Sequence, residues 1–433
     1  MLHLRILFVY PESTNVLFKN TEEVFLMKDL FLKWQKISLV TRIGLGIIIG
    51  VLLALTLPDT FSFVSIFGTI FVSALKAIAP VLVLILVIQA ISSHTSTNET
   101  NMKLILMLYA IGTLSAGAVG VIISFLFPVN LTLSGVGADA SSPEGILEVL
   151  QTLLLNLFNN PVTALMNANY LSILFWAVVF GIALKGAASS TKLIISNFGD
   201  AIIMVVKWII ELAPIGIIGL VFDAIATSGL SILSEYAHLL LVLLGSMVVV
   251  ALVVNPLIVY LVTKKNPYPL VFLVLRESGI TAFFTRSSAA NIPVNLNLSK
   301  KLGLNKETYS VSIPLGATIN MAGASITISV LALAATHTLG IQVDIFTAIL
   351  LVFISAISAA GASGVPGGSL LLIPLACGFF GISQDISMQI VAIGFIIAIL
   401  QDSCETALNS STDVLFTAAA DQAAKAKEKK LAI

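Results

Sequence analysis

The residues best suited to chemistry stand in an otherwise apolar stretch, 384–420. They are Asp402, Glu405, Thr406, Asn409 and Asp413. An α-helix advances about 100° per residue, so positions 402, 406, 409 and 413 fall on one helical face. A charge at bilayer depth costs about 2.5–3.5 kcal/mol on insertion scales, and such a row must face a polar interior. The pattern predicts an ion or substrate pathway. A structural polar seam is the weaker alternative, because two carboxylates and an amide exceed what packing needs.

The composition indicates a membrane protein. Hydrophobic residues make up 58% of the 433 residues and charged residues only 10%, which is too apolar for a soluble chain of this length. The 22 basic and 22 acidic residues cancel, so no basic field predicts nucleic acid as a partner. Cys377 and Cys404, the two cysteines, lie in apolar sequence and give neither a disulfide framework nor a metal-ligand spacing.

The first 26 residues are mixed and polar. Their longest apolar run, Ile6 to Tyr10, is too short for the core of a signal peptide. We therefore expect no cleaved targeting segment. Met27 opens the basic stretch KDLFLKWQK, which leads into the first span, and we hypothesise that translation starts there.

Windows of about 20 apolar residues predict membrane-spanning helices in the first part of the chain. These lie near 40–58, 62–92, 103–127, 162–187, 193–227 and 237–263, with an amphipathic piece near 145–158. The loops 128–148 and 228–236 contain no Lys or Arg, whereas Lys residues flank the opposite ends of these helices. The positive-inside rule therefore places the N-terminus and the Lys-bearing loops in the cytoplasm.

Two apolar segments are expected to enter and leave the membrane on the same side. Lys265 and Lys300 bracket the first, 266–299, which is too short for two full spans. The second, 345–379, lies between two loops that lack Lys and Arg. The irregular tips of such re-entrant hairpins must be buried in protein or line a cavity. Two hairpins from opposite faces form an inverted repeat, as in secondary transporters that bind substrate near the midplane.

The helix predicted at 308–336 contains a polar break, from Gly316 to Gly323. Glycine lowers the cost of unwinding, which frees backbone carbonyls to bind a cation. Asn320 within the break and Asp413 on the last helix add the oxygen ligands that a hard cation such as Na⁺ prefers. The alternative for the two glycines is close helix packing.

Four long motifs give the C-terminal half a specific likeness. They are TRSSAANIP at 285–293, PLGATINMAG at 314–323, GASGVPGGS at 361–369 and QDSCETALNSSTD at 401–413. With these motifs the chain resembles the dicarboxylate/amino-acid:cation symporters, and is most similar to their bacterial sodium:serine/threonine branch. The resemblance implies an all-α polytopic fold of eight transmembrane helices and two re-entrant hairpins with an inverted-repeat core. It also implies a homotrimer that works by an elevator motion.

The resemblance also assigns roles to individual residues. The substrate-binding set it implies is Ser287, Ser288, Val365, Asp402, Glu405, Thr406 and Asn409, with Asp402 for the amine and Ser288, Asn409 and the backbone around Val365 for the carboxylate. The sodium ligands it implies are Gly316, Asn320, Asn409 and Asp413 at one site, and Thr318, Met321 and backbone carbonyls at 359–362 at a second. Arg286 is expected to pair with Asp402, although a cytoplasmic anchor that reaches to the membrane surface is an alternative.

Two departures from the family pattern bear on the substrate. Glu405 stands where members that carry acidic substrates have an Arg, and it would repel a second carboxylate. Asn320-Met321-Ala322-Gly323-Ala324 replaces the motif NMDGT, which puts a further sodium site in doubt. We therefore expect sodium-coupled import of small neutral L-amino acids, serine and threonine above all. A proton-coupled carrier and a symporter of acidic amino acids or dicarboxylates are the alternatives within the same fold.

The resemblance divides the chain into four regions. These are a cytoplasmic segment at 1–39, mainly scaffold and trimerisation helices with transport helices interspersed at 40–263, a transport core at 264–420 and a cytoplasmic tail at 421–433. The expected location is the bacterial inner membrane. Two other classes of protein are disfavoured. An aspartyl enzyme would need adjacent carboxylates, but Asp402 and Asp413 lie roughly 16 Å apart along one helix, and a channel would show a ring of identical filter residues.

Overall fold

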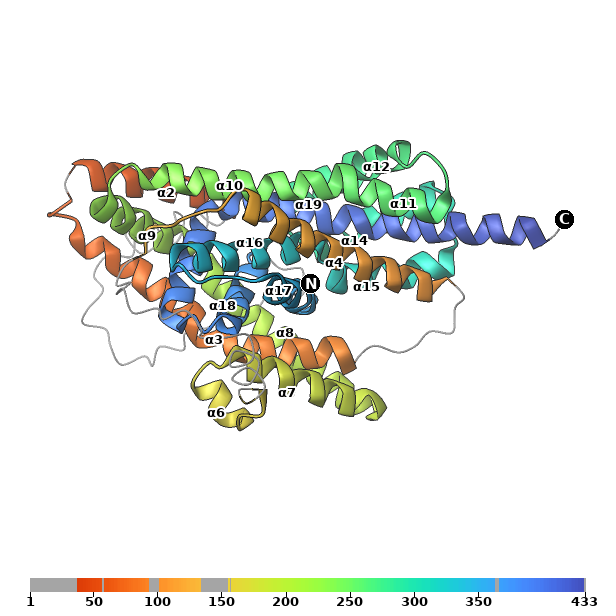
Figure 1. Ribbon diagram of the computed structural model, residues 1–433, viewed down its shortest axis with the longest axis horizontal. Coiled ribbons are helices and arrows are strands. Elements are labelled where there is room, and N and C mark those ends of the chain that lie inside the picture. The colour runs from red at the N-terminus through yellow and green to blue at the C-terminus, as the bar shows by residue number, and fades with distance from the viewer. Residues whose placement is uncertain are drawn as a thin grey trace, which may run out of the picture.

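The computed structural model describes residues 37–56, 58–92, 101–133, 155, 157–362 and 366–431. Every regular element among these residues is a helix, which agrees with the predicted all-α class. The helices form an elongated bundle, and the last helix projects from one end of it (Figure 1). Met27 and Val365, together with most of the amphipathic piece expected near 145–158, lie outside the described residues.

The first part of the chain contributes helices that match most of the predicted spans. In chain order these are α2 (Leu39–Thr56), η1 (Ser62–Val64), α3 (Ser65–Ser92), α4 (Met102–Leu126), α6 (Pro161–Met166), α7 (Tyr170–Ala183), η2 (Leu184–Gly186), α8 (Ser189–Glu211), α9 (Ala213–Ser228), α10 (Ile232–Val249), η3 (Val250–Val254) and α11 (Asn255–Thr263). The element η3 is a π-helical turn, so α10 and α11 run on as one long rod, as predicted for 237–263.

Two of the predicted spans are interrupted. The single helix expected at 193–227 is wrong, because the chain breaks at Leu212 into α8 and α9. Pro214 stands in the first turn of α9, where its missing N–H is tolerated, whereas inside a helix the same residue would remove a hydrogen bond. The span expected at 162–187 is divided between α6 and α7 by a turn at Ala168, whose φ is 49°.

The second part of the chain contributes α19, which carries the polar row, and the helices that precede it. They are α12 (Tyr268–Val274), η4 (Leu275–Gly279), α13 (Ile280–Thr285), α14 (Ser288–Lys301), α15 (Lys306–Ile319), α16 (Ala322–Thr338), α17 (Ile345–Ala359), η5 (Ser369–Leu372), α18 (Ile373–Phe379) and α19 (Gln384–Leu431). The predicted break in the helix at 308–336 is present, because Asn320 and Met321 leave helical geometry between α15 and α16.

Both segments predicted as hairpins reverse direction. The first hairpin, residues 268–301, turns at Arg286, whose backbone is left-handed with φ 52°. Ser287 then caps α14, since its Oγ accepts a hydrogen bond from the N–H of Ala290 at 3.2 Å. The second hairpin, residues 345–379, packs α17 against α18. In each segment the two arms lie side by side, α13 against α14 and α17 against α18.

The second hairpin begins at a well-made helix cap. The Asp344 carboxylate accepts hydrogen bonds from the Thr347 hydroxyl at 2.7 Å and from the N–H groups of Phe346 and Thr347 at 2.8 and 3.1 Å. These bonds, that of the Thr347 hydroxyl first, hold the pKa of Asp344 below its usual value. A carboxylate at this position satisfies N–H groups that have no partner within the helix.

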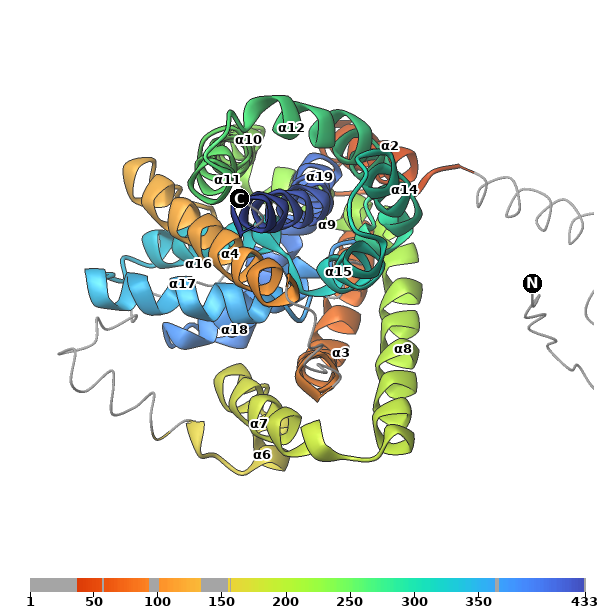
Figure 2. The ribbon, with the colours of Figure 1, turned by 90° about the vertical axis from the view of Figure 1, so that its right-hand side faces the viewer.

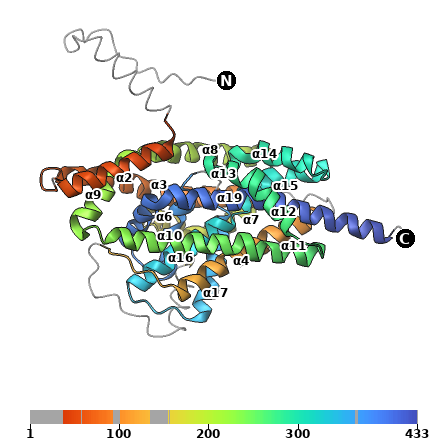
Figure 3. The ribbon, with the colours of Figure 1, turned by 90° about the horizontal axis from the view of Figure 1, so that it is seen from above.

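The long helix α19 lies at the centre of its end of the bundle. Viewed end-on, it is surrounded by α4, α11, α12, α14 and α15 (Figure 2). It also packs against α13, α16 and α18. From above, α2 and α9 lie side by side at one end of the molecule, with α14 and α15 at the other (Figure 3). The polar row on α19 therefore faces protein on several sides.

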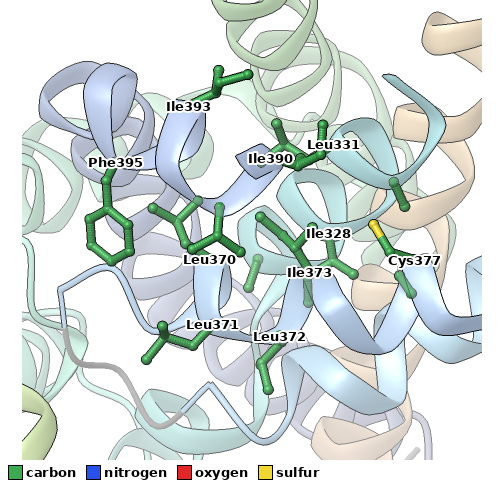
Figure 4. Packing of buried hydrophobic residues seen from close by; sticks show 14 of the residues in the cluster. Ile328, Leu331, Leu370, Leu371, Leu372, Ile373, Cys377, Ile390, Ile393 and Phe395 are labelled. Atoms are coloured by element: carbon green, nitrogen blue, oxygen red, sulfur yellow. The ribbon is translucent and has the colours of Figure 1, made fainter. Parts of the chain in front are cut away.

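An apolar cluster fixes the second hairpin to the helices behind it. Leu370, Leu371, Leu372 and Ile373 pack with Ile328 and Leu331 of α16 and with Ile390, Ile393 and Phe395 of α19 (Figure 4). Small residues bring the neighbouring backbones together, and a Cβ added to Gly120 of α4 would lie 2.6 Å from the Ser329 hydroxyl of α16. Close approach of this kind is usual between helices in membranes.

The surface of the bundle agrees with a lipid environment. Six helices of the described chain are long and apolar enough to cross a membrane. They cover Ser62–Gln89, Met102–Leu126, Ser189–Glu211, Ile232–Thr263, Lys306–Thr338 and Gln384–Ala426. Large apolar side chains such as Ile48, Leu241 and Phe284 are exposed on the bundle, in numbers that a water-soluble protein rarely shows.

The first hairpin can be tested by cysteine labelling. With Cys377 and Cys404 replaced by Ala, Lys265→Cys and Lys300→Cys should both react with an impermeant maleimide from the cytoplasmic face only. Both lysines are exposed, so access is not limited by packing. Ser231→Cys, in an exposed loop predicted to lie outside, is the matched reference for labelling from the other face. Labelling of Lys265→Cys and Lys300→Cys from opposite faces would rule out the hairpin.

Candidate functional site

Three carboxylates of the polar row on α19, between residues 402 and 413, are almost fully removed from solvent. The exposed fractions are 2% for Asp402, 5% for Glu405 and 0% for Asp413. A buried carboxylate is destabilising unless hydrogen bonds or an opposite charge satisfy it. The partners of each carboxylate therefore show what this part of the molecule is built to do.

Asp402 joins the tips of the two hairpins. Its Oδ2 accepts a hydrogen bond from Nε of Arg286 at 2.7 Å, and its Oδ1 accepts one from the N–H of Gly367 at 3.1 Å. Arg286 belongs to the first hairpin and is only 5% exposed, so it is not an anchor that reaches to the membrane surface. The expected pairing of Arg286 with Asp402 is present as a buried ion pair.

Glu405 lies in a set of hydrogen-bond donors that the sequence did not reveal. Its Oε2 accepts from the hydroxyls of Thr327 and Ser369 at 2.7 and 2.8 Å and from Nε2 of Gln401 at 2.6 Å. Only Gln401, four residues before Glu405 on the same helix, had a spacing that could have indicated the contact. Thr327 and Ser369 come from α16 and the second hairpin, and no local pattern links them to Glu405.

Asp413 and Asn320 form the second polar centre. Nδ2 of Asn320 donates to Oδ1 of Asp413 and to the Thr412 hydroxyl, each at 2.9 Å. Two buried oxygens of this centre, Oδ2 of Asp413 and Oδ1 of Asn320, have no hydrogen-bond partner in the described part of the chain. A carboxylate oxygen and an amide oxygen without donors suit a hard cation.

The glycines of the break serve different contacts. A Cβ on Gly316 would lie 2.5 Å from Oδ1 of Asp413, so only glycine lets the carboxylate approach α15 this closely. A Cβ on Gly323 would lie 2.9 Å from Cα of Glu405, which is a contact between two helices. Gly316 thus borders the polar centre of Asp413 and Asn320. Gly323 instead allows close packing of two helices, which the sequence offered as the alternative role for these glycines.

Asn409 holds the start of α16. Its Oδ1 accepts a hydrogen bond from the N–H of Gly323 at 2.7 Å, in the first turn of that helix. Such N–H groups have no partner within their own helix, and here a side chain of another helix supplies it. Nδ2 of Asn409 donates to the sulfur of Met321 at 3.4 Å, which is a weak acceptor.

The other predicted residues are placed differently. Ser287 and Ser288 lie beside Arg286 at the tip of the first hairpin, and Ser288 is buried. The Thr406 hydroxyl donates to the Asp402 carbonyl of its own helix at 2.8 Å. Thr318 is exposed, and its hydroxyl donates to the Leu315 carbonyl of its own helix at 2.7 Å.

A further buried network fastens the first hairpin to α19. Nδ2 of Asn291 donates to the hydroxyls of Ser410 and Ser278 at 2.8 and 3.0 Å. Nδ2 of Asn295 donates to the Ser410 carbonyl at 2.9 Å. The spacing of four residues between the two asparagines puts both on one face of α14. This network lies outside the predicted site and ties the hairpin to the helix that carries the carboxylates.

The comparison with known families now decides the class of protein. The family described as "Sodium:dicarboxylate symporter family" matches residues 39–423, nearly the whole chain. The chain belongs to this family. It is therefore a multi-pass membrane transporter of the symporter class rather than an enzyme, and the family description indicates coupling to a cation. The broad part of the resemblance is confirmed.

Substitution of Gly316 tests the second polar centre of the symporter. In the unaltered protein, Na⁺ should raise the melting temperature more than K⁺ does. Gly316→Ala should reduce this difference by more than half, because the new Cβ displaces the Asp413 carboxylate. Gly378→Ala is the matched control, since a Cβ there meets nothing within 4 Å and its φ is not positive. A sodium response in Gly316→Ala equal to that of the control would remove Asp413 from the cation site.

Proposed function

We propose that this symporter imports small neutral L-amino acids, serine and threonine above all, together with sodium. One observation carries the choice of a neutral substrate. Among the described residues of the core at 264–420, the one buried cation is Arg286, and it is already paired with Asp402. A second carboxylate on the substrate side chain would be left without a cation.

Glu405 adds a repulsive element against acidic substrates. It stands at the position where the resemblance places an Arg in acidic-substrate members, and it is buried. A substrate carboxylate brought beside it would lose its water and face a like charge. Specificity often depends on such a mismatch as much as on new attraction.

The neighbours of Glu405 suit a hydroxyl side chain. The hydroxyls of Thr327 and Ser369 each donate a hydrogen bond to the carboxylate of Glu405. A substrate hydroxyl can both donate and accept, and so can join such a group without leaving a polar atom unpaired. A site built around a hydroxyl penalises ligands that lack it, which favours serine and threonine over larger apolar residues.

The common part of an amino acid would be held between the hairpins. In this proposal Asp402 receives the ammonium, while Ser287, Ser288, Asn409 and the backbone at Val365 receive the carboxylate. Nδ2 of Asn409 donates to the Met321 sulfur, which is a weak acceptor, and a carboxylate oxygen would be a much stronger one. Thr406 and Glu405 would face the side chain.

Sodium would travel in the centre around Asp413. The two unpartnered oxygens of Asp413 and Asn320 support this assignment, and Gly316 supplies the close approach of the backbone. Thr318, Met321 and the carbonyls at 359–362 remain the proposed second sodium site.

The resemblance supplies the wider context of the proposal. We infer eight transmembrane helices and two re-entrant hairpins, with residues 264–420 as the moving core, 40–263 mainly as scaffold, and segments 1–39 and 421–433 in the cytoplasm. The chain would work as a homotrimer by an elevator motion in the bacterial inner membrane. The family description names dicarboxylates, which makes an acidic substrate the second candidate. Glu405 could carry a proton, so coupling to protons in place of sodium is the other alternative.

Reconstitution tests both the substrate and the coupling ion. Proteoliposomes should accumulate labelled L-serine under an inward sodium gradient and not under a proton gradient alone. Unlabelled threonine should compete strongly and aspartate should not, because a second carboxylate lacks a cation and meets Glu405. Efficient competition by aspartate would show that the substrate is wrongly assigned, and uptake driven by protons alone would replace sodium as the coupling ion.

Two aspartate variants separate the roles of the polar centres. Asp402→Asn should abolish serine uptake, because loss of one partner of a buried charge-assisted pair costs about 2–5 kcal/mol. Asp413→Asn should raise the sodium concentration for half-maximal uptake more than the serine concentration. Asp200→Asn, an exposed carboxylate on α8, is the control. Unchanged sodium dependence in Asp413→Asn would make that residue structural.

A further inference from the structure

The guanidinium of Arg286 has donor capacity that the protein does not use. Its Nε bonds to Asp402, but Nη1 is buried and has no hydrogen-bond partner among the residues that the structure describes. A buried, charged donor without a partner is destabilising. An orphaned group of this kind calls for a ligand or an unusual structural role.

The backbone at Arg286 is also held in an uncommon conformation. Its φ of 52° and ψ of 31° lie in the left-handed region, which is unfavourable for a residue with a side chain. The chain adopts it while its N–H donates to the Ala282 carbonyl at 2.8 Å, closing α13. This turn directs a charged side chain into the protein interior, where exposure falls to 5%. Residues held in such conformations cluster at ligand sites.

The surroundings of the pair fit an α-amino acid. Asp402 and Arg286 present one negative and one positive group side by side, with Ser287 and Ser288 next to the arginine. A free α-amino acid is a zwitterion whose two charges are close together. Because its net charge is zero, it can enter between the two residues without changing the total charge of the buried core.

We propose that the substrate zwitterion inserts into the Arg286–Asp402 ion pair. The substrate ammonium takes Asp402, and its carboxylate takes the guanidinium of Arg286, starting from the unused Nη1. Arg286 is then a specificity-determining residue that contacts the substrate. This inference rests on the proposed function for the class of ligand, and it adds a cationic partner for the α-carboxylate to the neutral ones already named.

The insertion explains how the empty and loaded cores both avoid an unpaired charge. Without substrate, Arg286 and Asp402 neutralise each other at 2.7 Å. With substrate, each has an opposite charge of the ligand instead. A substrate with only one of the two charges leaves one of these residues buried without a partner, which is strongly destabilising. The pair therefore selects for zwitterions.

Charge complementation between protein and ligand tests the insertion. L-Serinamide replaces the substrate carboxylate with a neutral amide, and at about pH 6 its amine is charged, since α-amines titrate near 7.7–8.0. Binding of serine and serinamide is measured on purified protein by competition with labelled serine and by thermal stabilisation. The unaltered protein should prefer serine strongly, and Arg286→Gln should reduce this preference by at least about tenfold, a coupling within the usual range.

Two further variants make the result specific. Arg286→Lys keeps the positive charge and should keep most of the preference for serine. Arg276→Gln removes an arginine of the same hairpin that is exposed and pairs with Glu277 at 2.8 Å, and it should behave as the unaltered protein. Equal weakening of serine and serinamide in Arg286→Gln, or loss of both, would overturn the insertion, because either result assigns Arg286 a purely structural role.

The test separates this inference from the proposed substrate. If the unaltered protein binds alanine better than serine, the proposed substrate is wrong, and alanine with alaninamide serves as the ligand pair. The insertion is then supported if Arg286→Gln reduces the preference for alanine over alaninamide, and it is contradicted if that preference is unchanged. The substrate assignment and the insertion can therefore fail independently.

Discussion

Burial of three carboxylates in the middle of one helix is the constraint on which the rest of the core depends. Asp402, Glu405 and Asp413 are each removed from water in the middle of α19. A buried carboxylate without a partner would destabilise the folded protein by more free energy than most single contacts contribute. The helices around α19 are therefore arranged to bring donors to fixed points along it. The first hairpin provides a guanidinium, the second hairpin an N–H and a hydroxyl, and the broken helix an amide.

The backbone donors come from the irregular parts of the chain, because N–H groups inside a regular helix are already bonded. Thr327 and Gln401 add side-chain donors from within helices. Only tips, caps and breaks have free backbone N–H groups. Gly367 follows the tip of the second hairpin, and Gly323 lies in the first turn after the break. Their N–H groups bond to Asp402 and Asn409 of α19. The hairpins and the break thus allow a polar centre to exist within apolar surroundings.

The sequence predicted the carboxylate row and the helix break better than it predicted the donors that bind the carboxylates. The row on α19 and the break at Asn320 follow from helical periodicity and from glycine, and the lysines at 265 and 300 indicated the first hairpin. The partners of Glu405 were missed because Thr327 and Ser369 are ordinary residues until folding brings them to it. The division at Leu212 was missed because Pro214 lies in a continuous apolar run, where hydropathy alone predicts one long helix.

The charges of the core give a physical reason for coupling the proposed neutral substrate to a cation. Among the described residues of the core at 264–420, one buried cation, Arg286, stands against the buried carboxylates of Asp402, Glu405 and Asp413. A zwitterion that enters this core leaves its total charge unchanged, so the substrate alone cannot neutralise the remaining carboxylates. A cation can do so, most directly at Asp413, whose Oδ2 has no donor. Movement of a buried charge through a low-dielectric region is strongly opposed. In the proposed mechanism, a core loaded with cation and substrate together therefore moves most easily, which is what a symporter requires.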